Sequence, residues 1–131
     1  MTIHETVVPR PPRFQTIVGI DAATCLVMAA LLVGGRAILA GILGIPQFVL
    51  VGAGGILVPV AVFMALVAAR SSTPRWAAWT VITGNAAWVI ASVVLAFGQF
   101  VAPAPLGIAF ILGQALVVSI FTAIEYRTYA R

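Results

Sequence analysis

Four long apolar stretches dominate the hydrophobic pattern of this chain, and short segments rich in polar residues, glycine or proline separate them. A helix needs about 20 mostly apolar residues to cross a bilayer. Inside hydrocarbon the backbone must satisfy its own hydrogen bonds, so each stretch is predicted to be a helix. The predicted spans are residues 14–33, 47–69, 76–98 and 106–126.

The segments between these stretches are short, which favours antiparallel neighbours. The predicted fold is therefore all-α, an antiparallel bundle of four transmembrane helices. Residues 1–13 contain three prolines and are predicted to be a flexible tail on the cytoplasmic side, with the transmembrane domain following at 14–131.

Residues 36–45 are apolar but too short to cross a bilayer. We interpret them as a short helix lying in the outer membrane interface. The alternative is a longer and tilted second span that includes them.

Composition supports a membrane setting. Hydrophobic residues make up 63% of the chain and charged residues 8%, with a mean hydropathy of +1.17. Soluble domains have roughly 25% charged residues, so this chain cannot surround a core with a polar surface. Lipid is the predicted partner.

The first stretch is longer than the apolar part of a signal peptide, about 7–15 residues, and contains Asp21, so we interpret it as a retained helix.

The arginines predict the orientation. The net charge of +4 does not indicate nucleic-acid binding, because the arginines form no continuous basic stripe. Arg36 is alone on one side of the predicted membrane, and by the positive-inside rule the other side is cytoplasmic, with both termini there. The arginines on that side are Arg10, Arg13, Arg70, Arg75, Arg127 and Arg131.

Small residues four positions apart predict where the helices pack, because they allow close approach of two backbones. The chain has such a pair or series in each span. They are Gly19 and Ala23, Ala61 and Ala65, Ala87 and Ala91, and Ala115 and Ser119.

Polar residues within the spans are the candidate functional residues, since a central Asp costs about 2.5–3.5 kcal/mol to insert. Asp21 and Asn85 lie eight and ten residues inside their spans, counted from Arg13 and Arg75, so they are predicted at similar depths. Pro59 falls at the same level. These residues form either a hydrogen-bonded cross-link between helices or a site that handles a proton, an ion or a ligand.

The candidate intramembrane polar site also includes two residues of the fourth span. Gln114 and Glu125 are eleven residues apart, almost three helical turns, and therefore share a face. Gln114 is interpreted as an interhelical hydrogen-bonding residue. Glu125 is only two residues before Arg127, so we interpret it as an acid near the cytoplasmic headgroups. The lone Cys25 is interpreted as a packing residue.

Several activities are not supported by any motif. His4 is the sole histidine and lies in the predicted tail, so a histidine-bound haem or metal within the bundle is excluded. Neither a phosphate-binding loop nor a catalytic triad is present. We therefore expect no cofactor, no metal and no enzymatic activity.

Some short segments resemble a family of small bacterial four-span membrane proteins. They are Gly19–Ala22, Leu43–Pro46, Asn85–Ser92, Gly107–Phe110 and Gln114–Ala115. The resemblance implies a bacterial inner-membrane location and carries no activity with it. The small multidrug transporters also have four spans and an acid in the first, but they use a glutamate in a different sequence setting.

Two hypotheses follow. The first is a non-enzymatic accessory or self-associating subunit of a membrane assembly, favoured by the small-residue faces. The second is a small proton-coupled transporter or ligand-binding membrane protein in which Asp21 titrates, favoured by the depth of that acid.

Overall fold

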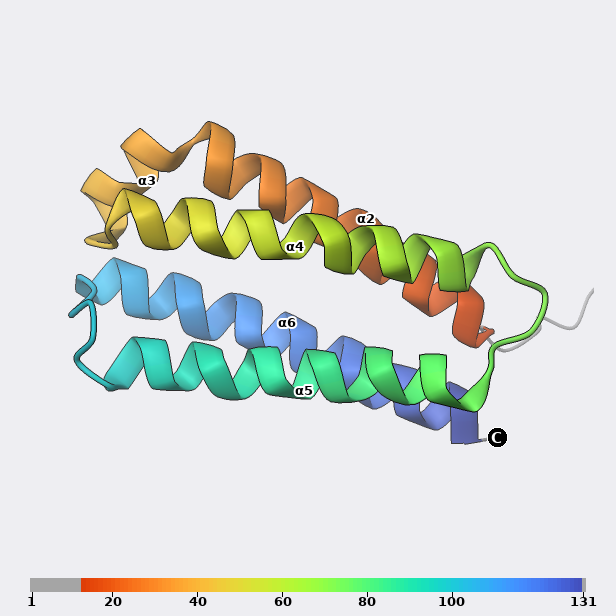
Figure 1. The fold of residues 1–131 in the computed structure, drawn as a ribbon. Helices are drawn as coiled ribbons and strands as arrows, with labels where there is room; N and C mark the ends of the chain where they lie inside the picture. The colour runs from red at the N-terminus through yellow and green to blue at the C-terminus, as the bar shows by residue number, and fades with distance from the viewer. Residues whose placement is uncertain (1–12, 131) are drawn as a thin grey trace, which may run out of the picture.

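The computed structural model describes residues 13–130, which form helices joined by short loops and contain no strand. Four of these helices are long and apolar enough to cross a membrane. The predicted all-α bundle of four transmembrane helices is thereby confirmed. The helices in chain order are α2 (Phe14–Gly34), α3 (Arg36–Leu43), α4 (Gln47–Ala68), α5 (Arg75–Phe97) and α6 (Pro105–Ala130), of which α3 is the short one (Figure 1).

The helix ends agree with the predicted spans to within one or two residues, except at the end of α6. Pro74 directly precedes α5 and Pro105 is the first residue of α6, positions at which proline costs no helical hydrogen bond. α6 continues to Ala130 instead of ending near Tyr126. No glycine or proline occurs in residues 126–130 to stop it. The predicted tail lies outside the described residues, apart from Arg13.

Residues 36–43 form a helix of their own, so the second span is not extended to include them. Gly44 ends α3 with a left-handed φ of 66°, a conformation that costs little only for glycine. The backbone N–H of Ala104 donates a hydrogen bond of 3.0 Å to the carbonyl of Leu43. α3 is thereby attached to the start of α6.

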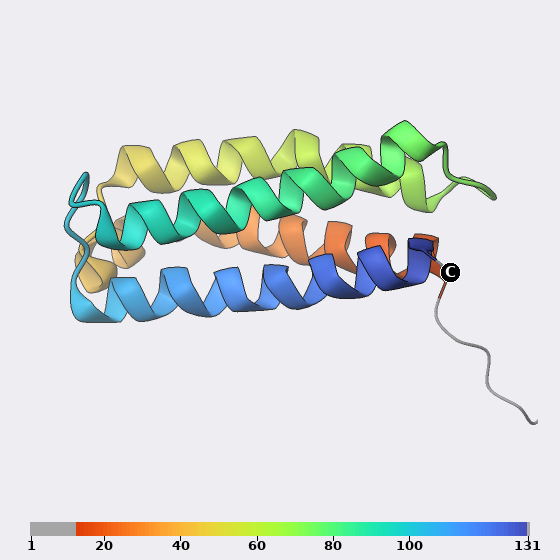
Figure 2. The ribbon, with the colours of Figure 1, turned by 90° about the horizontal axis from the view of Figure 1, so that it is seen from below.

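The bundle consists of two helix pairs, α2 with α4 and α5 with α6, and in each pair the backbones pack closely (Figures 1 and 2). At Gly54 of α4 an added Cβ would lie 2.7 Å from Val33 Cγ2, so only glycine allows α2 to approach this closely. By contrast, α4 and α5 are consecutive along the chain but their backbones make little contact.

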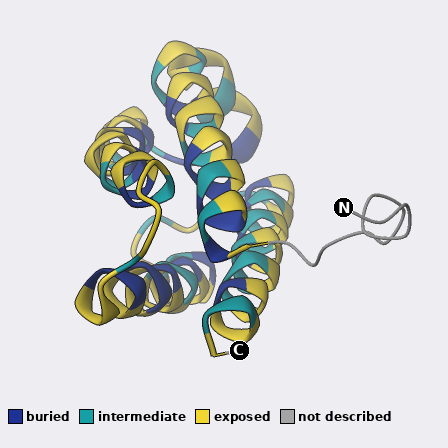
Figure 3. Cartoon of the chain, turned by 90° about the vertical axis from the view of Figure 1, so that its right-hand side faces the viewer, coloured by how far each residue is buried: buried dark blue, intermediate teal, exposed yellow. Residues whose placement is uncertain are grey.

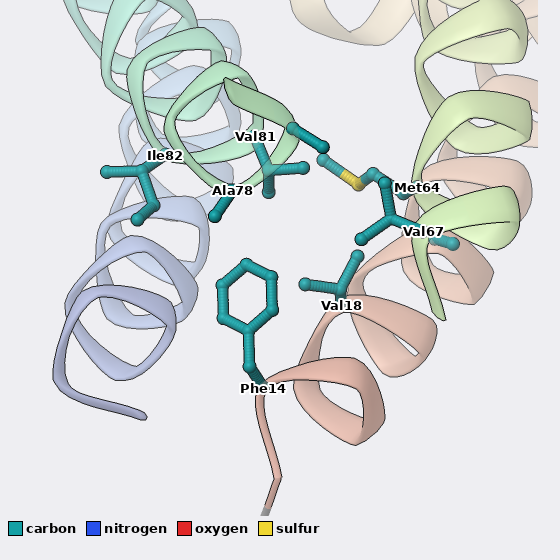
Figure 4. Packing of buried hydrophobic residues seen from close by; sticks show 9 residues of the cluster. Phe14, Val18, Met64, Val67, Ala78, Val81 and Ile82 are labelled. Atoms are coloured by element: carbon teal, nitrogen blue, oxygen red, sulfur yellow. The ribbon is translucent and has the colours of Figure 1, made fainter. Parts of the chain in front are cut away.

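Two apolar clusters join the pairs near opposite ends of the bundle. The first, near the end where α2 starts and α6 finishes, is called the basic-end cluster. In Figure 4 the Phe14 ring and Val18 of α2 lie between the side chains of α5 and those of α4. Its buried members are Phe14, Val18, Ala22, Met64, Val67, Ala77, Ala78, Val81 and Ile82.

The second cluster, the far-end cluster, is built around residues from all five helices and the α3–α4 turn. Its buried members are Ala29, Leu32, Leu43, Ile45, Leu50, Leu57, Ala96 and Ile111. On α5 the buried Asn85 and Ser92 fall between Ile82 of the first cluster and Ala96 of the second, and the buried Asp21 lies at the inner edge of the first cluster on α2. The interior is therefore layered: apolar, polar, apolar.

The outward faces of the helices are exposed (Figure 3), and many large apolar side chains are among the exposed residues. Large side chains such as Val27, Phe48 and Ile90 are 70%, 76% and 65% exposed. Continuous apolar surface of this extent marks contact with membrane or with another protein. Together with four helices of spanning length, it makes the chain a multi-pass membrane protein.

Candidate functional site: two buried carboxyl groups bridged by Asn85

One amide group joins three helices in the polar layer. The Nδ2 of Asn85, on α5, donates a hydrogen bond of 2.8 Å to Asp21 Oδ2 on α2 and another of 2.8 Å to Glu125 Oε1 on α6. All three side chains are buried, with exposed fractions of 6%, 2% and 0%. An amide nitrogen carries two hydrogens, so both are used to bridge the two carboxyl groups.

The positions of Asp21 and Asn85 follow from the sequence. Each lies inside its helix by about 10–15 Å, measured from the first residue with a rise of 1.5 Å per residue. The two helices start at the same end of the bundle (Figure 1). The direct hydrogen bond between the two side chains confirms that they lie at the same level.

The interpretation of Glu125 as an acid near the headgroups was wrong. Its side chain is fully buried and reaches Asn85. The prediction measured depth from Arg127 and took the helix to end there, whereas α6 continues for five residues beyond Glu125. The signal that could have placed it correctly was its helical phase, which it shares with the inward-facing Gln114.

The two carboxyl groups lack a cation to balance them. The Cys25 thiol lies 3.8 Å from Asp21 Oδ1 as a weak donor, and Glu125 Oε2 has no hydrogen-bond partner within residues 13–130. Every arginine in the same part of the chain is exposed. Two negative charges on neighbouring buried carboxyl groups would repel one another strongly.

Gln114 takes part in a second polar network, one helical turn further along α5. Its Oε1 accepts a hydrogen bond of 2.9 Å from Trp88 Nε1, and its Nε2 donates to Ser92 Oγ at 2.9 Å. Gln114 thus links α6 to α5 and is not part of the carboxyl pair. Both networks belong to the polar layer.

Two cavities flank the carboxyl pair, one on each side of the junction between the helix pairs. The α2–α6 cavity, of about 440 Å³, is lined by Asp21, Cys25 and Trp88 among others. The α4–α5 cavity, of about 320 Å³, is lined by Asn85, Pro59 and again Cys25 and Trp88. Both are partly open to the surface of the bundle. Pro59 therefore lies beside the site, across a cavity from it.

The predicted packing residues divide into two groups. Those in contact within the chain are Gly19, whose added Cβ would meet Ala68 at 3.4 Å, the buried Ala61 and Ala115, and the partly buried Ser119. Those exposed on the surface of the bundle are Ala23, Ala65, Ala87 and Ala91.

Comparison with known proteins adds no assignment. No protein-family model, curated protein or solved structure matches the chain. The resemblance to small bacterial four-span proteins stays a prediction. Within residues 13–130, no three side chains of His, Cys, Asp or Glu come together as a metal site. The carboxyl pair and its two cavities are thus the candidate site.

Proposed function

We propose that this protein is a small proton-coupled membrane transporter, in which Asp21 and Glu125 together bind the coupling proton. The observation that carries the proposal is the single Asn85 amide bridging two buried carboxyl groups from two other helices. Ionisable groups at this depth in a membrane bundle are characteristic of proton relays and substrate pathways.

The orientation of the Asn85 amide favours a proton over a metal ion. Asn85 directs its NH₂ group, and not its carbonyl oxygen, toward both acids. Hard cations prefer carboxylate and carbonyl oxygens as ligands, whereas an NH₂ group repels them. A proton shared between Asp21 and Glu125 needs no further ligands.

The surroundings favour transport over a purely structural cross-link. A purely structural cross-link is expected to satisfy the buried oxygens that it brings together. Glu125 Oε2 is buried and has no hydrogen-bond partner in the described part of the chain, and such groups call for an explanation beyond packing. In addition, the site lies where two separate helix pairs meet, with a cavity on either side.

In this proposal, repulsion between the two carboxylates couples loss of the proton to a movement of the helix pairs. With one proton on the pair, Asn85 and the shared proton hold α2, α5 and α6 together. When the proton leaves, two like charges face each other in an apolar interior and repel. The loosely joined helix pairs then shift, and the accessible side of the site changes.

Cys25 provides the test, because it is the sole cysteine, lies beside Asp21 and lines both cavities. A small membrane-impermeant methanethiosulfonate is applied to either face of vesicles of both orientations. We expect the ratio of the two labelling rates to change with pH. Taking the ratio removes the intrinsic pH dependence of the thiol. In Asp21→Asn and Glu125→Gln the ratio should be independent of pH.

The control places a thiol where no cavity leads. In the double variant Cys25→Ser/Val18→Cys the new thiol replaces a buried side chain of the basic-end cluster, 0% exposed, that lines neither of the two cavities. It should stay unlabelled from both faces. A wild-type protein whose labelling ratio is constant across pH, or whose Cys25 never reacts, would make the site a static cross-link.

We further propose that the protein lies in a bacterial inner membrane with both termini in the cytoplasm. Support comes from the arginines, six of which fall on one side of the predicted spans and one, Arg36, on the other. The start of α2 and the end of α6 lie at the same end of the bundle (Figure 2).

Self-association as a subunit of a membrane assembly is a second candidate function. The observation that favours it is the exposure of Ala87 and Ala91, one turn apart on α5, where they make the kind of surface that another helix can approach closely. The molar mass of the protein in detergent should then correspond to a dimer or larger oligomer. The double variant Ala87→Leu/Ala91→Leu should reduce it to a monomer.

A further inference from the structure

The α2–α6 cavity has the chemistry of a site for a lipophilic organic cation. We infer that the transported substrate is such a monovalent cation, held in this cavity with its charge against Asp21. This inference rests on the proposed transport function and names its substrate class.

The walls of the α2–α6 cavity combine aromatic and aliphatic groups with one acid. Asp21 lies in its wall, and the rings of Trp88, Phe110 and Phe121 line it together with aliphatic side chains. Its volume of about 440 Å³ is within the range of small-molecule sites, roughly 300–1,000 Å³. Aromatic faces attract cations, and the attraction is stronger when water is excluded.

The charge of the lining selects the charge of the ligand. Among the described residues that line the cavity, Asp21 is the one acid, and none is an arginine, lysine or histidine. An anion would therefore be repelled by the carboxyl pair. A neutral apolar molecule would gain nothing from it. A cation would compensate the negative charge that remains when the shared proton leaves.

A small inorganic cation fits this cavity poorly. Apart from Asp21, the polar side chains of the lining are Thr24, Cys25 and Gln114. The Thr24 hydroxyl donates to its own helix at Ile20, and Gln114 is occupied by Trp88 and Ser92. Too few oxygens are left to replace a hydration shell, whereas an organic cation is held by apolar contact.

Binding is therefore an exchange of one cation for one proton. The other titratable groups near the pair are few, so the exchange has a simple pH dependence. Cys25 is the one on α2, α4 contains none, and on α5 Arg75 lies ten residues before Asn85. On α6, Tyr126, Arg127 and Tyr129 follow Glu125 near the helix end, and both Tyr126 and Arg127 are exposed.

The experiment measures binding of tetraphenylphosphonium to the purified full-length protein in detergent by calorimetry. Repeating it in buffers of different ionisation enthalpy counts the protons released. We expect one proton released per cation bound, and in acidic buffer an affinity that falls about tenfold for each pH unit. Tetraphenylborate, a similar molecule of opposite charge, should not bind.

Variants locate the site. Asp21→Asn should weaken tetraphenylphosphonium binding at least about tenfold. Because that variant also alters the polar layer, a second one fills the cavity and keeps the acids. Gly113 lines the cavity, and its added Cβ would meet no atom within 4 Å, so Gly113→Leu should fold and block binding. The matched control Gly55→Leu, at an equally open position outside the cavity, should bind normally.

Three results would overturn the inference: no binding of tetraphenylphosphonium at any pH, equal binding of tetraphenylborate, or binding without proton release. Normal binding by Gly113→Leu would move the site elsewhere and also contradict it. These failures are distinguishable from failure of the proposed function. If Cys25 labelling still depends on pH while the phosphonium does not bind, transport stands and the substrate class is wrong.

Discussion

At the scale of single residues, Asn85 is the residue on which the polar layer depends. It supplies the hydrogen bonds of two buried acids at once. Replacing it with an apolar side chain of similar size leaves both carboxyl groups without their donor. Replacing an exposed polar side chain on the same helix should matter little. Removing one partner of a buried hydrogen bond typically costs about 1–3 kcal/mol.

We therefore expect Asn85→Leu to lower the free energy of unfolding in detergent micelles by about 1–3 kcal/mol. Unfolding is followed by circular dichroism with increasing dodecyl sulfate. Thr83→Val is the control on the same helix, because the exposed Thr83 hydroxyl donates to the carbonyl of Trp79 within its own helix. It should change stability by less than about 0.5 kcal/mol. Equal stability of the two variants would show that the bridge contributes nothing.

At the scale of helices, the close approach of α2 and α4 depends on Gly54. An added Cβ would lie 2.7 Å from Val33 Cγ2 and 3.2 Å from the carbonyl oxygen of Ala29, which belongs to the backbone and cannot turn away. Adjacent Gly55 has open space instead. The two glycines therefore form a matched pair with opposite surroundings.

Gly54→Val should destabilise the protein by about 1–3 kcal/mol, the usual cost of overpacking. Gly55→Val should be tolerated and stay close to wild type. The measurement is the midpoint of thermal unfolding in the same detergent. If both substitutions behaved alike, the α2–α4 crossing would be looser than the packing at Gly54 indicates.

The turn between α3 and α4 depends on Gly44 for a different reason. Its φ is 66°, and an added Cβ would lie 2.7 Å from the backbone nitrogen of Ala104. Gly44→Ala thus combines a left-handed conformation, which costs about 1–2 kcal/mol for other residues, with a backbone clash. Gly41→Ala, within α3 and in open space, should be neutral or stabilising. Protease sensitivity of residues 98–104 in the two variants distinguishes these outcomes.

At the scale of the whole molecule, two closely packed helix pairs are joined by apolar clusters toward the ends and by the carboxyl pair between them. This division matters for the proposed mechanism, in which the polar layer is the part of the junction whose strength depends on a proton. The apolar clusters keep the pairs together in either state.

The orientation of the bundle is tested by cysteines introduced in a Cys25→Ser background. Ala130→Cys at the end of α6 should react with an impermeant maleimide only from the cytoplasmic side. Arg36→Cys, exposed at the start of α3, should react only from the opposite side. Labelling of intact cells and of inverted vesicles makes the comparison. Reaction of Ala130→Cys in intact cells would reverse the proposed topology.

The sequence by itself determined the membrane setting, the four spanning helices and the shared level of Asp21 and Asn85. Hydrophobicity, hydrogen bonding along one backbone and helical rise are local properties, so they can be read from spacing. The tertiary structure decided that Glu125 turns inward to join them, that the helices form two pairs, and where the cavities lie. These features depend on which helix faces approach each other, a choice that residues distant in sequence make together.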